Sequence, residues 1–261
     1  MDYNRSPEDH KHRSHRFLAA NSFVPALLHL EGCDQQVKLT TAWLQGHIEI
    51  PEIRNKWAEG PIVKVRIAVP ATALPGKTIP VRVVMTSNKV GHDYPTGPLD
   101  MIQSWVELRV KDATGHTIFT SGQPNERHFL TPGTFLFKAE PVDQYGNLID
   151  RHNLWEMVGV RYRRSLFPGY SDTVEYNVMC PSGGPSLPME RINPNTNFSI
   201  PPGGQGGKLH IEAILHYRKI DQFLLNYVMG DKSGLTAPVV DIASATADVC
   251  VAKVGDKAKC P

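Results

Sequence analysis

One imidazole stands in a short loop rich in glycine and proline, and its setting suits metal chemistry. The loop is Asn88-Lys89-Val90-Gly91-His92-Asp93-Tyr94-Pro95-Thr96-Gly97, and it connects two strand-like runs, residues 79–86 and 104–111. Rigid loop residues on a β scaffold would hold the ring in place before a metal arrives. Neutral imidazole is a common metal ligand, so His92 is a candidate ligand. The alternative is a loop histidine that caps a turn and binds nothing.

Strand-like alternation of apolar and polar residues dominates the rest of the chain. Glycine and proline contribute 21 residues each, which favours many turns over long helices. Two short helices are expected, one over residues 34–45 with Asp34 as N-cap and Gly46 as its stop, and one over 221–229. The predicted strands are residues 62–69, 79–86, 104–111, 116–120, 134–138, 155–163, 173–179 and 208–217.

These elements predict a mainly β fold, an antiparallel Ig-like β-sandwich with an extended N-terminal arm and one or two short helices. We expect residues 1–50 to form the arm and a helix that contact a partner. Residues 51–230 would form the sandwich, and residues 231–261 a C-terminal tail. Trp105 and Trp155 fit core positions of the two sheets.

The chain has four cysteines, and their spacing matches no zinc site. Cys250 and Cys260 bracket a short charged segment, which favours a disulfide that closes a hairpin within the tail. Cys33 and Cys180 are far apart in sequence and could form a second disulfide or remain free thiols. This pattern permits a location outside the cytoplasm without requiring it.

Charge, apolar runs and motifs argue against several function classes. The formal net charge of +2 gives no electrostatic basis for binding nucleic acid. No apolar run approaches the length of a transmembrane helix, and residues 1–5 lack the apolar core of a signal peptide. Paired catalytic carboxylates, a Ser-His-Asp order and a Gly-x-Ser-x-Gly elbow do not stand out, so we expect no enzyme.

For three further features we favour a structural interpretation over a ligand-binding one. The glycine-rich run 203–207 precedes a strand, not a helix, which argues against a phosphate cradle. Residues 143–147 lack the acidic ligands of a calcium loop and are better explained as a type I turn. His152 could be a ligand, but a packed histidine at the sandwich edge is the simpler interpretation.

Several segments, in this order, resemble the β-rich C-terminal domain of bacterial multihaem c-type cytochromes and the segment that leads into it. His15 lies in Ser14-His15-Arg16-Phe17-Leu18-Ala19-Ala20-Asn21, which is similar to the "SH-x-F-x-x-AN" segment that follows the last haem motifs in many members. His92 lies in a stretch similar to their "N…GH-x-F/Y-PTG" element. The similarity continues through residues 105–115, then Phe119 and Ser121-Gly122, residues 166–171, and Leu215-His216-Tyr217-Arg218.

The resemblance implies that His15 and His92 are axial ligands of haem iron. The chain contains no Cys-x-x-Cys-His, so it cannot attach a c-type haem through thioethers of its own. The expectation is therefore that haem c is bound to a multihaem cytochrome partner and contacted in trans. The exposed face of Arg161, Tyr162, Arg163 and Arg164 could meet haem propionates, although a solvated face is the simpler account.

Two interpretations follow from the resemblance. In the first, the chain docks on a multihaem cytochrome, outside the cytoplasm, and donates His15 and His92 within an electron-transfer complex, homo-oligomer or filament. In the second, the sandwich is an interaction domain that ligates no metal. The haem-bearing half of the family is missing, and a separate subunit, a split gene product and a cleaved piece all remain open.

Overall fold

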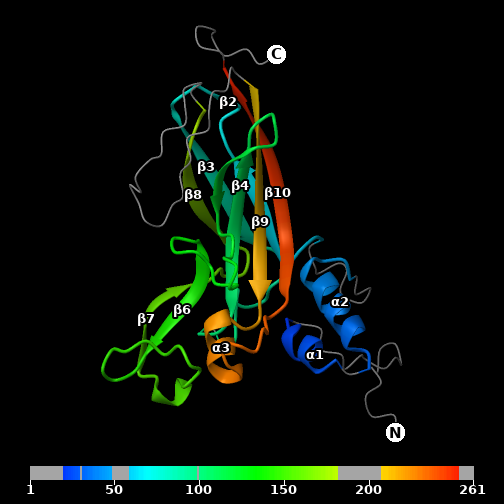
Figure 1. Cartoon of the computed structure of the whole chain (residues 1–261), viewed down its shortest axis with the longest axis vertical. Coiled ribbons are helices and arrows are strands. Elements are labelled where there is room, and N and C mark those ends of the chain that lie inside the picture. Colours follow the sequence, from blue (N-terminus) through cyan, green and yellow to red (C-terminus); the bar gives the residue numbers. More distant parts are fainter. Residues whose placement is uncertain (1–19, 30, 49–58, 99, 182–206, 253–261) are drawn as a thin grey trace.

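The computed structural model describes residues 20–29, 31–48, 59–98, 100–181 and 207–252. Two β-sheets run along the long axis of the molecule, and three short helices lie near one end (Figure 1). Within these residues no helix has the length and apolar character needed to cross a membrane. The predicted mainly β sandwich is confirmed.

The smaller sheet has three antiparallel strands in the order β1–β3–β8. The larger sheet has seven strands in the order β2–β10–β9–β4–β6–β7, with β5 paired to β4, and only the short β2–β10 pair is parallel. The strands are Val63–Ala68 (β1), Thr72–Ala73 (β2), Thr78–Ser87 (β3), Gln103–Lys111 (β4), Thr117–Ser121 (β5), Leu136–Val142 (β6), Gly159–Arg164 (β7), Ser171–Met179 (β8), Gly207–Arg218 (β9) and Val239–Val251 (β10).

The core lies between the two sheets and follows the alternation of the strands. In β3 every second residue is buried, and β9 shows the same period over most of its length. Side chains from both sheets form one continuous apolar cluster, which includes Ile79, Val81, Val83, Met85, Val106, Leu108, Val110, Leu209, Ile211 and Leu215. The period of two in the sequence therefore located the buried face correctly.

The larger sheet is also covered on part of its outer face. β4 has five consecutive buried residues, and the last four residues of β9 are all buried. Trp105 is 1% exposed but lies outside the main apolar cluster, because it alternates with the core-facing Val106. The structure places Trp155 differently from the prediction, because this side chain is 81% exposed in a short 3-10 turn, Leu154–Glu156, before β7.

The C-terminal boundary of the sandwich also differs from the prediction. The expected tail from residue 231 contains β10, a strand of 13 residues that pairs with β9 along almost its whole length. Its middle, from Ala243 to Asp248, consists of alanine, serine, threonine and aspartate and carries little hydrophobic contrast, so it gave no strand signal.

Of the two N-terminal helices, the second packs beside β10, and the first contacts the second and the region of the third helix (Figure 1). The two N-terminal helices are α1 (Phe23–Leu28) and α2 (Cys33–Leu44). The predicted Asp34 cap is wrong, since Gly32 precedes α2 in a left-handed conformation and Asp34 lies in the first turn. Leu44 belongs to the main core, so the helix is attached to the sandwich and is not part of a free arm. The third helix, α3 (Gln222–Met229), confirms the predicted helix after β9.

The cysteines divide into two kinds. Cys33 and Cys180 are free thiols, which decides the alternative that the sequence left open. Cys250 at the end of β10 is disulfide-bonded. Its predicted partner, Cys260, lies outside the described residues, so the pairing stays a prediction.

Two glycines that flank β5 provide a matched test of close backbone approach. Both have left-handed φ values, +84° at Gly115 and +80° at Gly122. A Cβ on Gly115 would meet nothing within 4 Å, whereas one on Gly122 would lie 2.2 Å from the Val106 carbonyl oxygen. Gly115→Ala should therefore lose about 1–2 kcal/mol from left-handed strain alone. Gly122→Ala should lose a further ~1–3 kcal/mol because the backbone must move.

Urea unfolding of the two variants and the wild type measures the difference in free energy of unfolding. Equal losses for the two glycines would contradict the close approach of residue 122 to β4.

Candidate functional site

The loop that carries His92 is fixed at its start by Asn88. The Asn88 side-chain amide donates to the carbonyl oxygens of Glu59 and Pro61, at 2.8 and 2.9 Å. Its backbone N–H, and that of Lys89, donate to the Ile62 carbonyl at 2.8 and 3.1 Å. These four bonds join the end of β3 to the segment that leads into β1. They therefore fix the direction in which the loop leaves the end of β3.

The loop is fixed again two residues after His92. Tyr94 is 4% exposed, and its backbone exchanges two hydrogen bonds with Leu166, at 2.8 and 2.7 Å. Its hydroxyl lies 2.7 Å from Ser104 Oγ, which donates its hydrogen to the His216 carbonyl oxygen at 3.0 Å. The Tyr94 hydroxyl must therefore donate to Ser104. Burial raises the pKa of Tyr94, so the phenol keeps its proton.

His92 lies between these two anchors and is exposed to solvent. Its Nδ1 is 3.1 Å from the carbonyl oxygen of Asp93. A carbonyl oxygen can only accept, so this bond requires the proton on Nδ1. In the neutral ring Nε2 then carries the lone pair that a metal could bind.

The carboxylate of Asp93 forms an ion pair with Arg163 of β7. This contact ties the His92 loop to the strand whose basic and aromatic residues the sequence singled out. Arg161 and Arg164 are also paired, with Glu140 and Asp172 respectively. The pairing with Arg164 holds the pKa of Asp172 below its usual value. Each arginine of β7 therefore already has a carboxylate partner.

The other predicted ligand cannot be placed, because His15 lies outside the described residues. Among the residues that the structure describes, no group of three or more histidine, cysteine, aspartate or glutamate side chains could hold a metal ion.

The turn at residues 143–147, which the sequence did not favour as a calcium loop, is held by hydrogen bonds to Asp143. Asp143 accepts from the backbone N–H of Tyr145 and Asn147 and from the Asn147 side chain, so local donors already occupy its oxygens.

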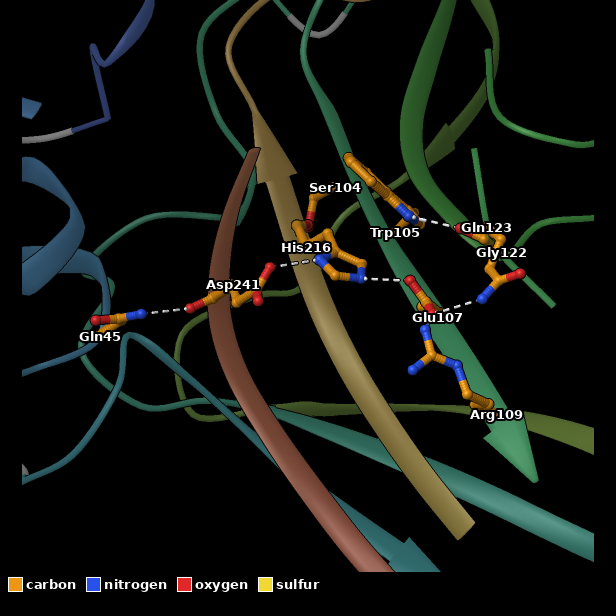
Figure 2. Close-up of polar contacts among 9 residues, drawn as sticks. All are labelled: Gln45, Ser104, Trp105, Glu107, Arg109, Gly122, Gln123, His216 and Asp241. Atoms are coloured by element: carbon orange, nitrogen blue, oxygen red, sulfur yellow. Dashed lines mark hydrogen bonds and ion pairs between the residues drawn. The ribbon is translucent and has the colours of Figure 1, made fainter. Parts of the chain in front are cut away.

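A second polar cluster, which the sequence did not predict, occupies the covered outer face of the larger sheet (Figure 2). His216 of β9 contacts a carboxylate on each side, with Nδ1 2.7 Å from Asp241 of β10 and Nε2 3.0 Å from Glu107 of β4. With both carboxylates ionised, each ring nitrogen of His216 can donate to one of them. The ring also lies against Trp105, with centroids 5.0 Å apart.

Glu107 is the most heavily contacted member of the cluster. Besides His216 it accepts from Gln123, at 3.3 Å, and pairs with Arg109 (Figure 2). Burial alone would raise the pKa of Glu107, but hydrogen bonds from His216 and Gln123 and the nearby positive charges outweigh it and lower the pKa. Because both nitrogens of His216 are occupied, this histidine joins three strands and has no lone pair for a metal.

The cluster extends to a buried guanidinium at the end of β9. Arg218 is 1% exposed and donates to Gln103 Oε1 at 2.6 Å and to the His128 carbonyl oxygen at 2.7 Å. Its guanidinium carbon lies 5.5 Å from the centroid of the Trp105 ring. Burial lowers the pKa of Arg218 to about 10. The sequence singled out residues 215–218 only through their resemblance to the cytochrome domain, because their partners lie far away along the chain.

Comparison with known proteins gives distant matches only. No protein-family model and no curated protein matches the chain. Among solved structures, a penta-heme cytochrome c552 from Thermochromatium tepidum aligns with a TM-score of 0.44 and 13% identity over 71% of this chain. This chain spans 39% of the length of that cytochrome.

Two other solved structures align less well. The CARDB domain of the PF1109 protein from Pyrococcus furiosus gives a TM-score of 0.30 at 13% identity, and covers 78% of this chain and 100% of its own. The C-terminal domain of wzt gives 0.30 at 9% identity, with 78% and 87% covered. These similarities are weak and concern the fold alone.

Replacing His216 tests whether the cluster stabilises the fold. His216→Ala leaves Glu107 buried without its main partner, and breaking a buried pair in this way typically costs about 3 kcal/mol or more. His210→Ala is the matched control on the same strand. His210 pairs with Asp248 of β10 at 2.9 Å, but both side chains are about half exposed, and exposed pairs contribute little.

Urea unfolding should therefore show a large loss for His216→Ala and little change for His210→Ala. Similar values for the two variants would show that the His216 cluster does not stabilise the sheet.

The lowered pKa of Glu107 predicts a pH dependence. Its stabilising contribution is complete above the ordinary glutamate value of 4.5 and is lost as the pH falls through the lowered pKa of the folded state. Glu107→Gln should therefore be less stable than the wild type at pH 6, and the gap should narrow as the pH approaches 3. The free energy of unfolding of both proteins across this range measures the effect. A gap that stays constant would contradict the assignment.

Proposed function

We propose that this chain is a component of a multihaem c-type cytochrome assembly that attaches no haem itself and donates His92 as an axial ligand to a haem iron of a partner. One observation carries the proposal. An exposed imidazole stands on a loop that is fixed on both sides, with Nδ1 bonded to a backbone carbonyl and Nε2 facing no partner among the described residues.

The described residues fit such a role. A haem ligand needs a neutral imidazole with one nitrogen directed at iron and the other held by a hydrogen bond. His92 has this arrangement, and the anchors at Asn88 and Tyr94 reduce the entropy lost when a loop ligand is ordered on binding. A bound haem iron would supply the redox centre, while this chain supplies the ligand and shields the iron from water.

His15 would be a second donor, as the resemblance implies. The disulfide at Cys250 supports a location in an oxidising compartment outside the cytoplasm. In this proposal the chain docks and ligates and performs no catalysis of its own. Its partner is a multihaem cytochrome subunit, in a complex or filament.

A second candidate function is docking without ligation. It is favoured by the apolar side chains that remain exposed around β7, among them Trp155 at 81%, Val158 at 68% and Val160 at 47%. Exposed apolar surface of this kind marks interaction sites. The two candidates differ only in whether an imidazole of this chain reaches iron.

Absorption and magnetic circular dichroism spectra of the assembled complex separate the candidates. His92→Ala should convert one haem from low spin to high spin, because one axial ligand is lost. His116→Ala is the control, since His116 is also exposed but lies in the turn between β4 and β5. Unchanged low-spin spectra for an assembled His92→Ala complex would leave docking alone as the function.

A further inference from the structure

A second imidazole, the partly exposed ring of His152, is oriented by a buried carboxylate. Its Nδ1 lies 2.9 Å from Asp100 Oδ2, and the side chains are 42% and 1% exposed respectively. The carboxylate comes from the same β3–β4 connection that carries His92, and His152 comes from the connection between β6 and β7. The sequence favoured a packed edge histidine at this position, whereas almost half of the side chain is accessible.

The pairing fixes which nitrogen of His152 remains available. An ionised carboxylate can only accept, so the bond to Asp100 places a proton on Nδ1 and leaves Nε2 with the lone pair. A carboxylate behind a histidine is the usual support of a metal-bound imidazole, because it fixes the ring and makes the other nitrogen more basic. Asp100 Oδ1 has no hydrogen-bond partner among the described residues, so this carboxylate is not shared with another donor there.

The backbone at His152 is also unusual. Its φ is +59°, in the left-handed region that residues other than glycine rarely adopt. Such a conformation costs about 1 kcal/mol or more and persists where the surroundings impose it. Here the Asp100 pair and the contact of the neighbouring Arg151 guanidinium with the Tyr227 ring, at 4.9 Å, hold the residue.

Exposed apolar side chains lie close to His152 in sequence or contact its neighbour Arg151. Leu154, Trp155 and Met157 follow His152 and are 36%, 81% and 47% exposed, and Tyr227 of α3 is 58% exposed. A porphyrin presents a wide apolar face around its metal, and these side chains could cover such a face. A solvated structural histidine would need no apolar surroundings.

We propose that His152 Nε2 is a further axial ligand for a haem iron carried by the partner, with Asp100 as its positioning residue. This inference rests on the proposed function, because the iron belongs to another chain. Two ion pairs join the β3–β4 connection to β7 and the segment before it: Asp93 pairs with Arg163 of β7, and Asp100 pairs with His152. His92 and His152 are therefore both tied to the β3–β4 connection, and in this proposal one partner contacts both.

The test uses the full chain and a ferric c-type haem peptide that has one open axial position. Titration followed by the change from high spin to low spin gives the number of tight equivalents per chain. His152→Asn is the informative variant, because asparagine tolerates left-handed φ and its amide can still donate to Asp100. The variant should bind one equivalent fewer than the wild type, and His92→Asn should also lose one.

The control for general histidine binding is His210→Asn. His210 is also carboxylate-paired and half exposed, but Asp248 behind it is itself exposed and shared with Lys208. This variant should keep every tight equivalent. Asp100→Asn should keep the number of equivalents but weaken one of them by about 10- to 100-fold, the usual effect of losing a supporting carboxylate.

The outcomes separate this inference from the proposed function. If His152→Asn binds as many equivalents as the wild type while His92→Asn loses one, His152 is not a ligand and the role of His92 stands. If neither variant loses an equivalent, both proposals fail. A purely structural role for the pair would appear as a lower melting temperature of Asp100→Asn with unchanged haem-peptide affinity.

A second measurement does not depend on any variant. In the wild type, long-range ¹H–¹⁵N spectra should show paramagnetic broadening of the His152 and His92 imidazole signals at low haem-peptide ratios, with the His210 signals unaffected. Broadening of His210 before His152 would overturn the inference.

Discussion

The burial of Tyr94 is the constraint on which the rest of the site depends. This side chain fills a place in the core beside Phe137, with ring centroids 5.8 Å apart, and burying an aromatic ring contributes about 1.5–3 kcal/mol. Its hydroxyl cannot remain unpaired there without a cost, and Ser104 satisfies it. The β3–β4 connection therefore cannot move away from the sheet without exposing the ring and breaking the bond. His92, two residues before Tyr94, is therefore held close to this anchor.

The same bond connects the loop to the polar cluster on the outer face. Ser104 accepts from the Tyr94 hydroxyl and donates to the His216 carbonyl oxygen. The His216 ring contacts Glu107 and Asp241 on the neighbouring strands. The centre of the larger sheet is thus held by apolar contacts on one face and by charge-assisted hydrogen bonds on the other. A loop mounted on such a centre can present a ligand with little loss of entropy on binding.

The sequence revealed those parts of the structure that depend on local pattern. The alternation in β3 and β9 identified their buried faces, and glycine and proline marked the loop of His92. Contacts between residues that are distant in sequence could not be predicted from local pattern. His216 meets Glu107 across 109 positions, and nothing in either segment predicts the pair. β10 escaped detection because its central residues show little hydrophobic contrast. Trp155 was placed in the core because it was assigned to a strand over residues 155–163, whereas β7 begins only at Gly159.

Histidines in this structure differ in what their ring nitrogens contact more than in how exposed they are. His216 has both nitrogens bonded to carboxylates and can serve only the sheet. His92 and His152 each have Nδ1 held, by a carbonyl and by a carboxylate respectively, and both are accessible to a partner. Sequence alone could not distinguish these cases, because each acceptor comes from the fold. A histidine with one nitrogen fixed and the other accessible is the arrangement that donation in trans requires. His210 also has Nδ1 held by a carboxylate, but Asp248 is itself exposed and shared with Lys208. Within the proposed function, His92 and His152 are therefore the better donors among these three histidines.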